Sequence, residues 1–158
     1  MADPHRPFRA SYLVTGSPRG RIFAALLDVR RFPEWAVGLR RVRTLDAAGK
    51  QTAEVRPGVA LEFTLSAAGL THRVVGAVTV VEPSHRLEWR YSEGATGSGG
   101  WLLEDAGPGT TQLTLSTDYR IKPEWLDRIA HRPLFRNLVE DLLRRSIRRF
   151  ERHLRENA

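Results

Sequence analysis

The sequence predicts one α+β domain in which a strand and two short helices precede an antiparallel sheet, and a long amphipathic helix ends the chain. Three observations indicate this fold class. Apolar residues recur with a helical period near the N-terminus, alternate with polar residues from about residue 39 to 121, and return to a helical period in the last third. A chain of 158 residues is of ordinary size for a single domain, so we expect one domain spanning 1–158.

Composition and charge exclude several classes of function. The chain has no cysteine, which excludes disulfides, thiolate metal sites and a cysteine nucleophile. No apolar run approaches the roughly 20 residues that cross a bilayer, and residues 1–10 lack the apolar segment of a secretory signal. We therefore expect a cytoplasmic protein without stable membrane insertion, whose residues 1–7 form a flexible tail. The net charge of +7 favours association with polyanions but does not establish it.

The N-terminal elements follow from the local sequence. Residues 8–14 are expected to form the first strand. Ser17 is a suitable N-cap and Pro18 suits the first position of a helix, and the apolar residues that follow share one helical face: Ile22, Phe23, Leu26 and Leu27. Pro33 disfavours helical backbone at the residue before it, so this helix must end, and a second short helix is expected over residues 34–37.

The middle of the chain alternates apolar and polar residues, which predicts strands joined by short turns in an antiparallel sheet. The expected strands are residues 59–65, 71–83, 85–91, 101–105 and 112–121. The segment GATGSGG, residues 94–100, is expected to be a flexible connection that could include a bulge. Because each strand has one apolar and one polar face, we expect one side of the sheet to be covered and the other to face water.

The last third is predicted to be helical, with a break or kink at Pro133. Apolar side chains form one broad arc of the final helix: Leu138, Val139, Leu142, Leu143, Ile147, Phe150 and Leu154. Arginines form the opposite arc: Arg144, Arg145, Arg148, Arg149, Arg152 and Arg155. Acidic residues four positions before three of these arginines favour ion pairs along the helix surface. We therefore expect the apolar arc to cover the sheet and the arginines to face water.

Several segments resemble one known superfamily. They are residues 17–45, 78–94 and 109–121 with the final helix, and their most specific feature is a Ser-Pro helix start followed by Asp28 and by Phe-Pro-Glu-Trp at 32–35. Over nearly its whole length the chain resembles the START-like, birch-pollen-allergen-like (SRPBCC) superfamily, and within it the polyketide cyclase/dehydrase and lipid-transport branch. The resemblance implies a helix-grip fold, in which a curved antiparallel sheet of about six to seven strands wraps around the C-terminal helix.

The resemblance also implies a hydrophobic cavity between the sheet and the final helix, of the kind that binds small molecules. The residues that would line it are Leu61, Phe63, Leu87, Trp89, Tyr91, Trp101, Leu115, Thr117, Tyr119, Leu138 and Leu142, with Phe135 as a further candidate. Tyrosine and tryptophan suit a cavity because each combines apolar area with a hydrogen-bonding group. The same side chains could instead be ordinary core residues. Trp35 is expected to anchor the corner at the short helices rather than to touch a ligand.

The sequence offers few candidates for acid–base or metal chemistry. Glu62, Glu88 and Asp118 fall on the face of the sheet expected to be wet, so surface roles are favoured over catalysis, and Asp105 is a further acidic candidate. His72 is the best-placed histidine, although a surface or hydrogen-bonded structural role is favoured for it. No nucleotide, flavin or metal motif is present, so we expect no metal and no cofactor, and no catalytic residue can be named.

Three functions remain open. The favoured function is binding or transport of a hydrophobic small molecule (a lipid, isoprenoid or polyketide) in the cavity. The second is a polyketide cyclase, aromatase or dehydratase that acts in the same cavity. The third is binding of an anionic surface or nucleic acid through the arginine arc, although no aromatic residues lie among the arginines and no recognition motif is present. We expect a hydrophobic small molecule as partner, no specific nucleic acid, and a strand edge that would permit a homodimer.

Overall fold

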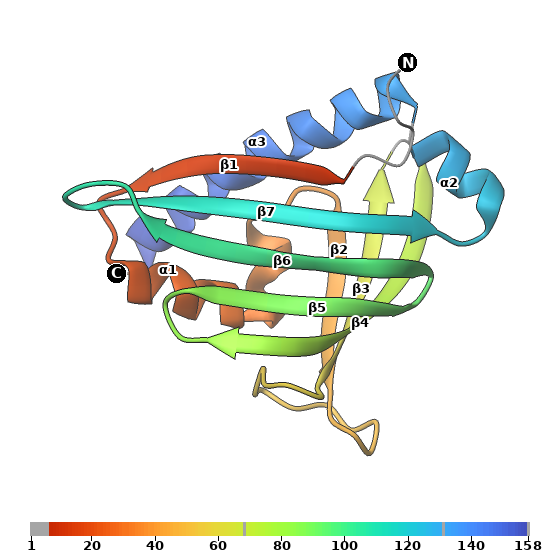
Figure 1. The fold of residues 1–158 in the computed structure, drawn as a ribbon, viewed down its shortest axis with the longest axis horizontal. Coiled ribbons are helices and arrows are strands. Elements are labelled where there is room, and N and C mark those ends of the chain that lie inside the picture. The colour runs from red at the N-terminus through yellow and green to blue at the C-terminus, as the bar shows by residue number, and fades with distance from the viewer. Residues whose placement is uncertain (1–6, 68, 131, 158) are drawn as a thin grey trace.

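The computed structural model describes residues 7–67, 69–130 and 132–157, so the expected tail lies outside it apart from residue 7. Its elements in chain order are β1 (Phe8–Thr15), α1 (Arg19–Leu27), η1 (Val29–Glu34), β2 (Leu39–Leu45), β3 (Ala60–Ala67), β4 (Leu70–Glu82), β5 (Arg86–Glu93), β6 (Ala95–Asp105), β7 (Thr110–Ile121), α2 (Glu124–Ala130) and α3 (Pro133–Glu156). Figure 1 shows a curled sheet in which β2 and β3 run across the direction of β5, β6 and β7.

All seven strands belong to one antiparallel sheet, in the order β1-β7-β6-β5-β4-β3-β2. Each strand from β2 to β6 pairs with the next along the chain, whereas β1 pairs with β7. The chain therefore crosses from one edge of the sheet to the other between β1 and β2, and α1 and η1 occupy this crossing (Figure 1). Register shifts interrupt the pairing of β4 with β5, and such irregularities increase local bending. The predicted helix-grip fold is confirmed.

Helix α3 packs on the sheet through the predicted apolar arc. Ile147, Phe150 and Leu154 are buried, and all six arginines of the opposite arc are exposed. The ring of Phe150 lies 4.6 Å from that of Trp35, which in turn lies 4.9 Å from that of Phe32. Burial of one large apolar side chain contributes about 1.5–3 kcal/mol, so the apolar arc, not the arginines, holds the helix in place.

The ends of the helices differ slightly from prediction. Helix α1 begins at Arg19, with Pro18 as its cap residue, and the Ser17 side chain makes no capping hydrogen bond. Pro133 does break the final helical region, because α2 ends at Ala130 and α3 begins at that proline, where the missing N–H costs no intrahelical hydrogen bond. None of the helices in the described ranges is long and apolar enough to cross a bilayer.

The second short helix lies earlier than predicted. It is a 3₁₀ helix over Val29–Glu34, not a helix over 34–37, and it contains Pro33. Residues three apart lie on the same side of a 3₁₀ helix. Val29, Phe32 and Trp35 have this spacing and all are buried. The 3₁₀ helix and its C-cap residue, Trp35, therefore place three apolar side chains in the core. The prediction from Pro33 alone did not take the burial of these side chains into account.

Residues 95–100 of the glycine-rich segment are part of a strand, with Gly94 in the bend before it, and the prediction of a flexible connection is wrong. Strand β6 runs unbroken from Ala95, pairs with β7 over residues 95–105 and pairs with β5 over residues 98–102. A Cβ atom on Gly97 would lie 1.9 Å from the carbonyl oxygen of Asp118, and one on Gly99 would lie 2.8 Å from the ring of Trp89. The glycines therefore permit close packing within the sheet.

Candidate ligand-binding cavity

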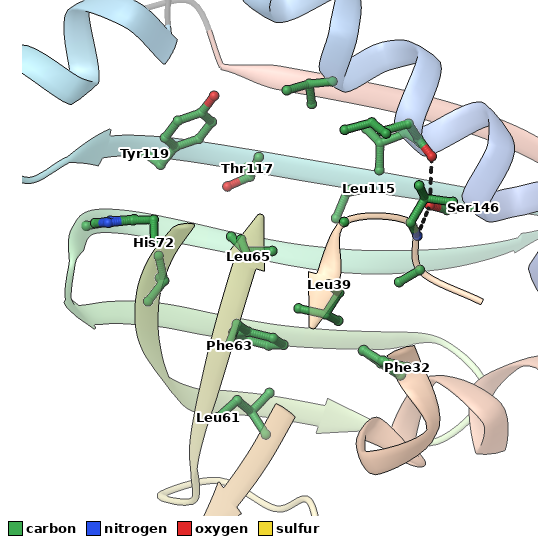
Figure 2. Close-up of a pocket in the computed structure, with 18 of the residues that line it drawn as sticks. Phe32, Leu39, Leu61, Phe63, Leu65, His72, Leu115, Thr117, Tyr119 and Ser146 are labelled. Carbon is green, nitrogen blue, oxygen red and sulfur yellow. Dashed lines mark hydrogen bonds between the residues drawn. The ribbon is translucent and has the colours of Figure 1, made fainter. Parts of the chain in front are cut away.

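A cavity of about 390 Å³ lies between the inner face of the sheet and α3, within the size range of small-molecule sites. Its wall combines residues of six strands with residues of η1, α2 and α3, and it is almost wholly apolar. Figure 2 shows these side chains arranged around the space, with Tyr119 and His72 on one side and Phe32 on the other.

The structure places the predicted sheet residues in this wall: Leu61, Phe63, Leu87, Trp89, Tyr91, Trp101, Leu115, Thr117 and Tyr119. From the final helix the wall includes the predicted Leu142 but not the predicted Leu138, which is half-buried beside it. The helix contributes Val139, Leu142, Leu143, Ser146 and Ile147. These residues are spaced three or four apart and so form one stripe. The side chain of Phe135 lies outside the described part of the chain.

The α3 stripe is tied to the end of η1 by one serine. The Ser146 hydroxyl donates to the Leu142 carbonyl at 2.7 Å and accepts a hydrogen bond from the Val37 N–H at 2.8 Å (Figure 2). Ser146 is buried, so both hydrogen bonds are shielded from competing water. This serine therefore fixes the distance between the helix and the loop that follows η1 at one edge of the cavity.

The short helices contribute more of the wall than the sequence indicated. Residues from the η1 region and α2 that line the cavity are Val29, Phe32, Trp35, Ala36, Leu126 and Ala130. Trp35 does pack at a corner, against Phe150, but it also reaches the cavity. The spacing of Leu126 and Ala130 could have indicated their place in the wall, because residues four apart lie on one face of a helix.

Polar atoms of the wall gather around Tyr91 and Thr117. The Tyr91 hydroxyl lies 2.8 Å from Oγ1 of Thr117, which donates to the Ser98 carbonyl at 3.4 Å. Burial raises the pKa of Tyr91 and the pKa of Tyr119 above the ordinary tyrosine value. Both hydroxyls therefore stay protonated and uncharged at neutral pH. Because Thr117 donates to Ser98, the Tyr91 hydroxyl donates to Thr117, and its oxygen can still accept a hydrogen bond.

His72 also lies in the wall and makes a hydrogen bond of its own. Its Nε2 is 2.8 Å from the carbonyl oxygen of Gly94, in the turn before β6. A carbonyl oxygen can only accept, so Nε2 carries the hydrogen and Nδ1 is the acceptor of the neutral ring. This bond fits the structural role favoured for His72, while its position in the wall leaves the side chain within reach of a ligand.

Charged side chains are absent from the described part of the cavity wall. Glu62 lies on the outer face as predicted, yet it is only 6% exposed because Arg43 and Arg73 each approach it to 2.6 Å. Glu88 and Asp118 are likewise not in the wall, and no cluster of histidine and carboxylate groups in the described ranges could hold a metal ion. An ionised group buried here would have no partner of opposite charge.

Together, the curled sheet, the long helix and the apolar cavity between them define a helix-grip protein of the START-like class. A family model described as polyketide cyclase/dehydrase and lipid transport matches residues 11–155, and the chain belongs to this family. No match was found among curated proteins.

Solved structures share this fold across almost their whole length. TTHA0849 from Thermus thermophilus is 14% identical, with a TM-score of 0.76 over 97% of this chain and 99% of the other. The Zhui aromatase/cyclase from Streptomyces sp. R1128 is 16% identical, with a TM-score of 0.73 over 95% and 93%. The ginseng major latex-like protein 151 from Panax ginseng is 13% identical, with a TM-score of 0.68 over 94% and 96%. Identities this low show a common fold only.

Proposed function

We propose that this protein binds and carries one hydrophobic small molecule (a lipid, isoprenoid or polyketide) in the cavity between the sheet and α3. The supporting observation is a hollow of about 390 Å³ with an apolar wall and no charged side chain in its described part. Water gains few hydrogen bonds in such a space, whereas an apolar ligand gains from leaving water. Membership of a family that includes lipid transport supports the proposal.

The polar atoms of the wall narrow the chemistry of the ligand. Tyr91, Thr117 and Tyr119 offer neutral hydroxyl groups, and Nδ1 of His72 is an acceptor. We infer a ligand with a long apolar body and one or two uncharged oxygen groups, such as a ketone, hydroxyl or ester. A ligand whose ionised carboxylate had to be buried would bind more weakly, because no cation in the described wall faces it.

Native mass spectrometry of protein purified without detergent tests the proposal, with extraction and identification of any bound lipophile. Affinity is then measured by titration with a fluorescent neutral lipophile. Leu115→Trp adds volume inside the cavity and is expected to weaken binding more than about tenfold, because the larger ring occupies space that the ligand would fill. Leu13→Trp is the matched control, because Leu13 is 60% exposed on β1 and lies outside the wall.

Equal affinity for the Leu115→Trp and Leu13→Trp proteins would refute binding in this cavity. Circular dichroism first establishes that both variants fold. If Leu115→Trp does not fold, Leu65→Trp replaces it, since Leu65 lines the same cavity but is 42% exposed and can accept a larger side chain.

A second function, polyketide cyclisation, aromatisation or dehydration, would use the same cavity. The fold shared with a Streptomyces aromatase/cyclase and the polar side chains in the wall favour it. Proton transfer would have to use Tyr91, Tyr119 or His72, because carboxylates do not line the described wall. Turnover of a synthetic poly-β-ketone, measured with Tyr91→Phe, Tyr119→Phe and His72→Asn, tests it. Absence of turnover by the native protein, or undiminished turnover by all three variants, would exclude this chemistry.

A further inference from the structure

Exposed apolar side chains gather at one end of the cavity. Among the described residues the large hydrophobic side chains that are exposed are Leu13, Leu65, Leu70, Trp125 and Leu134. Leu65 and Leu70 flank the tip of the β3–β4 hairpin and also line the cavity, so this end of the cavity is open. Trp125 precedes the cavity-lining Leu126 in α2, and Leu134 is in the first turn of α3.

Four of these residues, Leu65, Leu70, Trp125 and Leu134, are referred to as the rim. They come from four separate elements, and Figure 1 shows the tip of the β3–β4 hairpin, α2 and the start of α3 at the same end of the molecule. Trp125 is 56% exposed and Leu134 is 85% exposed. Isolated exposed leucines are common on proteins, but apolar residues that converge on the opening of an apolar cavity indicate a contact surface.

The segment that carries half of the rim is basic. Residues 120–136 contain five arginine or lysine residues against two acidic ones: Arg120, Lys122, Arg128, Arg132 and Arg136 against Glu124 and Asp127. One arginine is neutralised locally, because Arg128 pairs with Glu124 at 3.1 Å. The half of the rim on α2 and α3 therefore lies in a segment with a surplus of positive charge, which attracts a negatively charged partner.

We propose that the rim docks on the surface of an anionic lipid bilayer, so that a ligand passes between the bilayer and the cavity without crossing water. This inference rests on the proposed function. Leucine and tryptophan side chains enter the interfacial region of a bilayer, where tryptophan is especially favourable, and nearby basic residues add attraction to anionic headgroups. Both features are present at the end where the cavity opens.

Charge and side-chain type argue against other occupants of the rim. A second copy of the chain would bring the same basic segment against this one, and the two would repel each other. A nucleic acid would make use of the arginines but would leave Leu65, Leu70 and Leu134 without suitable partners, since single-stranded bases stack on aromatic rings. A bilayer surface satisfies the apolar and the basic residues together.

Sedimentation with vesicles tests the proposal on the whole protein without added ligand. We expect binding to phosphatidylcholine vesicles that contain phosphatidylglycerol and much weaker binding to phosphatidylcholine alone. Trp125→Ser with Leu134→Ser removes rim contacts, and Arg128→Glu with Arg132→Glu reverses the nearby charge; each pair should weaken binding more than about tenfold. The matched controls are Leu13→Ser, which is exposed away from the cavity, and Arg148→Glu with Arg152→Glu, which makes the same charge change on the arginine arc of α3.

Trp125 also provides an optical test of orientation. The other three tryptophans, Trp35, Trp89 and Trp101, are all less than 9% exposed. Quenching of fluorescence by acrylamide in solution therefore reports mainly on Trp125. Anionic vesicles should reduce this quenching, and the effect should disappear in Trp125→Phe while sedimentation of that variant persists.

Three outcomes would overturn the proposal: no preference for anionic vesicles, equal loss of binding in the rim and control variants, or unchanged quenching of Trp125 in the presence of bound vesicles. Binding of this protein to an acidic protein, but not to vesicles, would also overturn the proposal in favour of a protein partner. Binding of the lipophile is measured without vesicles, and vesicle binding is measured without ligand. Failure of docking can therefore be distinguished from failure of the proposed function.

Discussion

The indole ring of Trp89 in β5 lies against the backbone of Gly99 in β6, its paired residue, with no room for a side chain between them. A Cβ atom on Gly99 would come within 2.8 Å of ring atoms Cε2, Cζ2 and Nε1 of Trp89. Trp89 is also part of the cavity wall. The absence of a side chain at residue 99 therefore sets the position of one side of the cavity.

Gly99→Ala should displace the Trp89 ring. We expect a loss of about 1–3 kcal/mol in the free energy of unfolding, typical of an overpacked core, and weaker binding of the fluorescent lipophile. Chemical denaturation and ligand titration measure the two effects. Gly20→Ala is the control, because a Cβ there meets only Ser84 Oγ at 3.4 Å, and alanine in a helix is favourable by up to about 1 kcal/mol. Equal stabilities for the two variants would contradict the packing described.

All three tyrosines should resist ionisation in the folded protein. Burial raises the pKa of Tyr12, the pKa of Tyr91 and the pKa of Tyr119 above the ordinary value of about 10. Because burial favours the neutral tyrosines, these side chains contribute to stability below a pH of about 10. That contribution is lost as the pH rises through the raised pKa values of the folded protein. In a pH titration, the absorbance of tyrosinate should rise near pH 10 only in denaturant. A native titration that matches the unfolded one would refute this.

Glu62→Gln should destabilise the protein at neutral pH. Hydrogen bonds from Arg73 first, and then from Arg43, lower the pKa of Glu62. Its contribution to stability is therefore present above the unfolded pKa of about 4.5 and is lost as the pH falls through the lower folded pKa. We expect the free energy of unfolding to fall by about 1–3 kcal/mol at neutral pH, which is between the contributions of exposed and of buried ion pairs.

Urea denaturation at a series of pH values measures the effect of Glu62→Gln. The difference from the native protein should shrink towards zero in acid, where Glu62 itself becomes neutral. Glu54→Gln is the control, since Glu54 is 72% exposed and 3.6 Å from Arg56, and exposed pairs contribute little. A difference that is independent of pH would show that the glutamine disturbs packing rather than charge.

Phe150→Ala should be among the most damaging substitutions in α3. Phe150 is completely buried and packs against Trp35, so its removal leaves a cavity and an expected loss of about 3–5 kcal/mol. The neighbouring Arg149→Ala, on the exposed arc, should change the free energy of unfolding by less than about 0.5 kcal/mol. Thermal and urea denaturation measure both. A comparable loss for the two variants would mean that the arginine arc contributes to holding the helix.

Features with a regular period were predictable from the sequence. Alternation assigns Leu87, Trp89 and Tyr91 to one face of β5, and the covered face available to them is the one under α3. The same reasoning identifies the apolar stripe of the final helix, because its period of about 3.6 is sustained over several turns. Period alone does not fix the rotation of a helix to within one residue, which is why Leu138 was included in the predicted wall.

Features that depend on distant neighbours were not predictable. The glycines of β6 look like a flexible linker until Trp89 and Asp118 are placed against them. Glu62 alternates like a solvated residue, and only the approach of Arg43 and Arg73 from adjacent strands buries it. In each case the sheet brings together residues that are not adjacent in sequence, so a local sequence pattern does not predict their contact.

Because β1 pairs with β7 alone among the described strands, the sheet cannot be completed until β7, the last of its strands, has been made. The hydrogen bond between Ser11 and Thr114 spans 103 positions. During synthesis, which proceeds from the N-terminus, β1 leaves the ribosome long before β7, its only partner among the described strands. Of the strands in this sheet, β1 therefore waits longest for its partner, and its unpaired backbone groups are open to aggregation until β7 has been made.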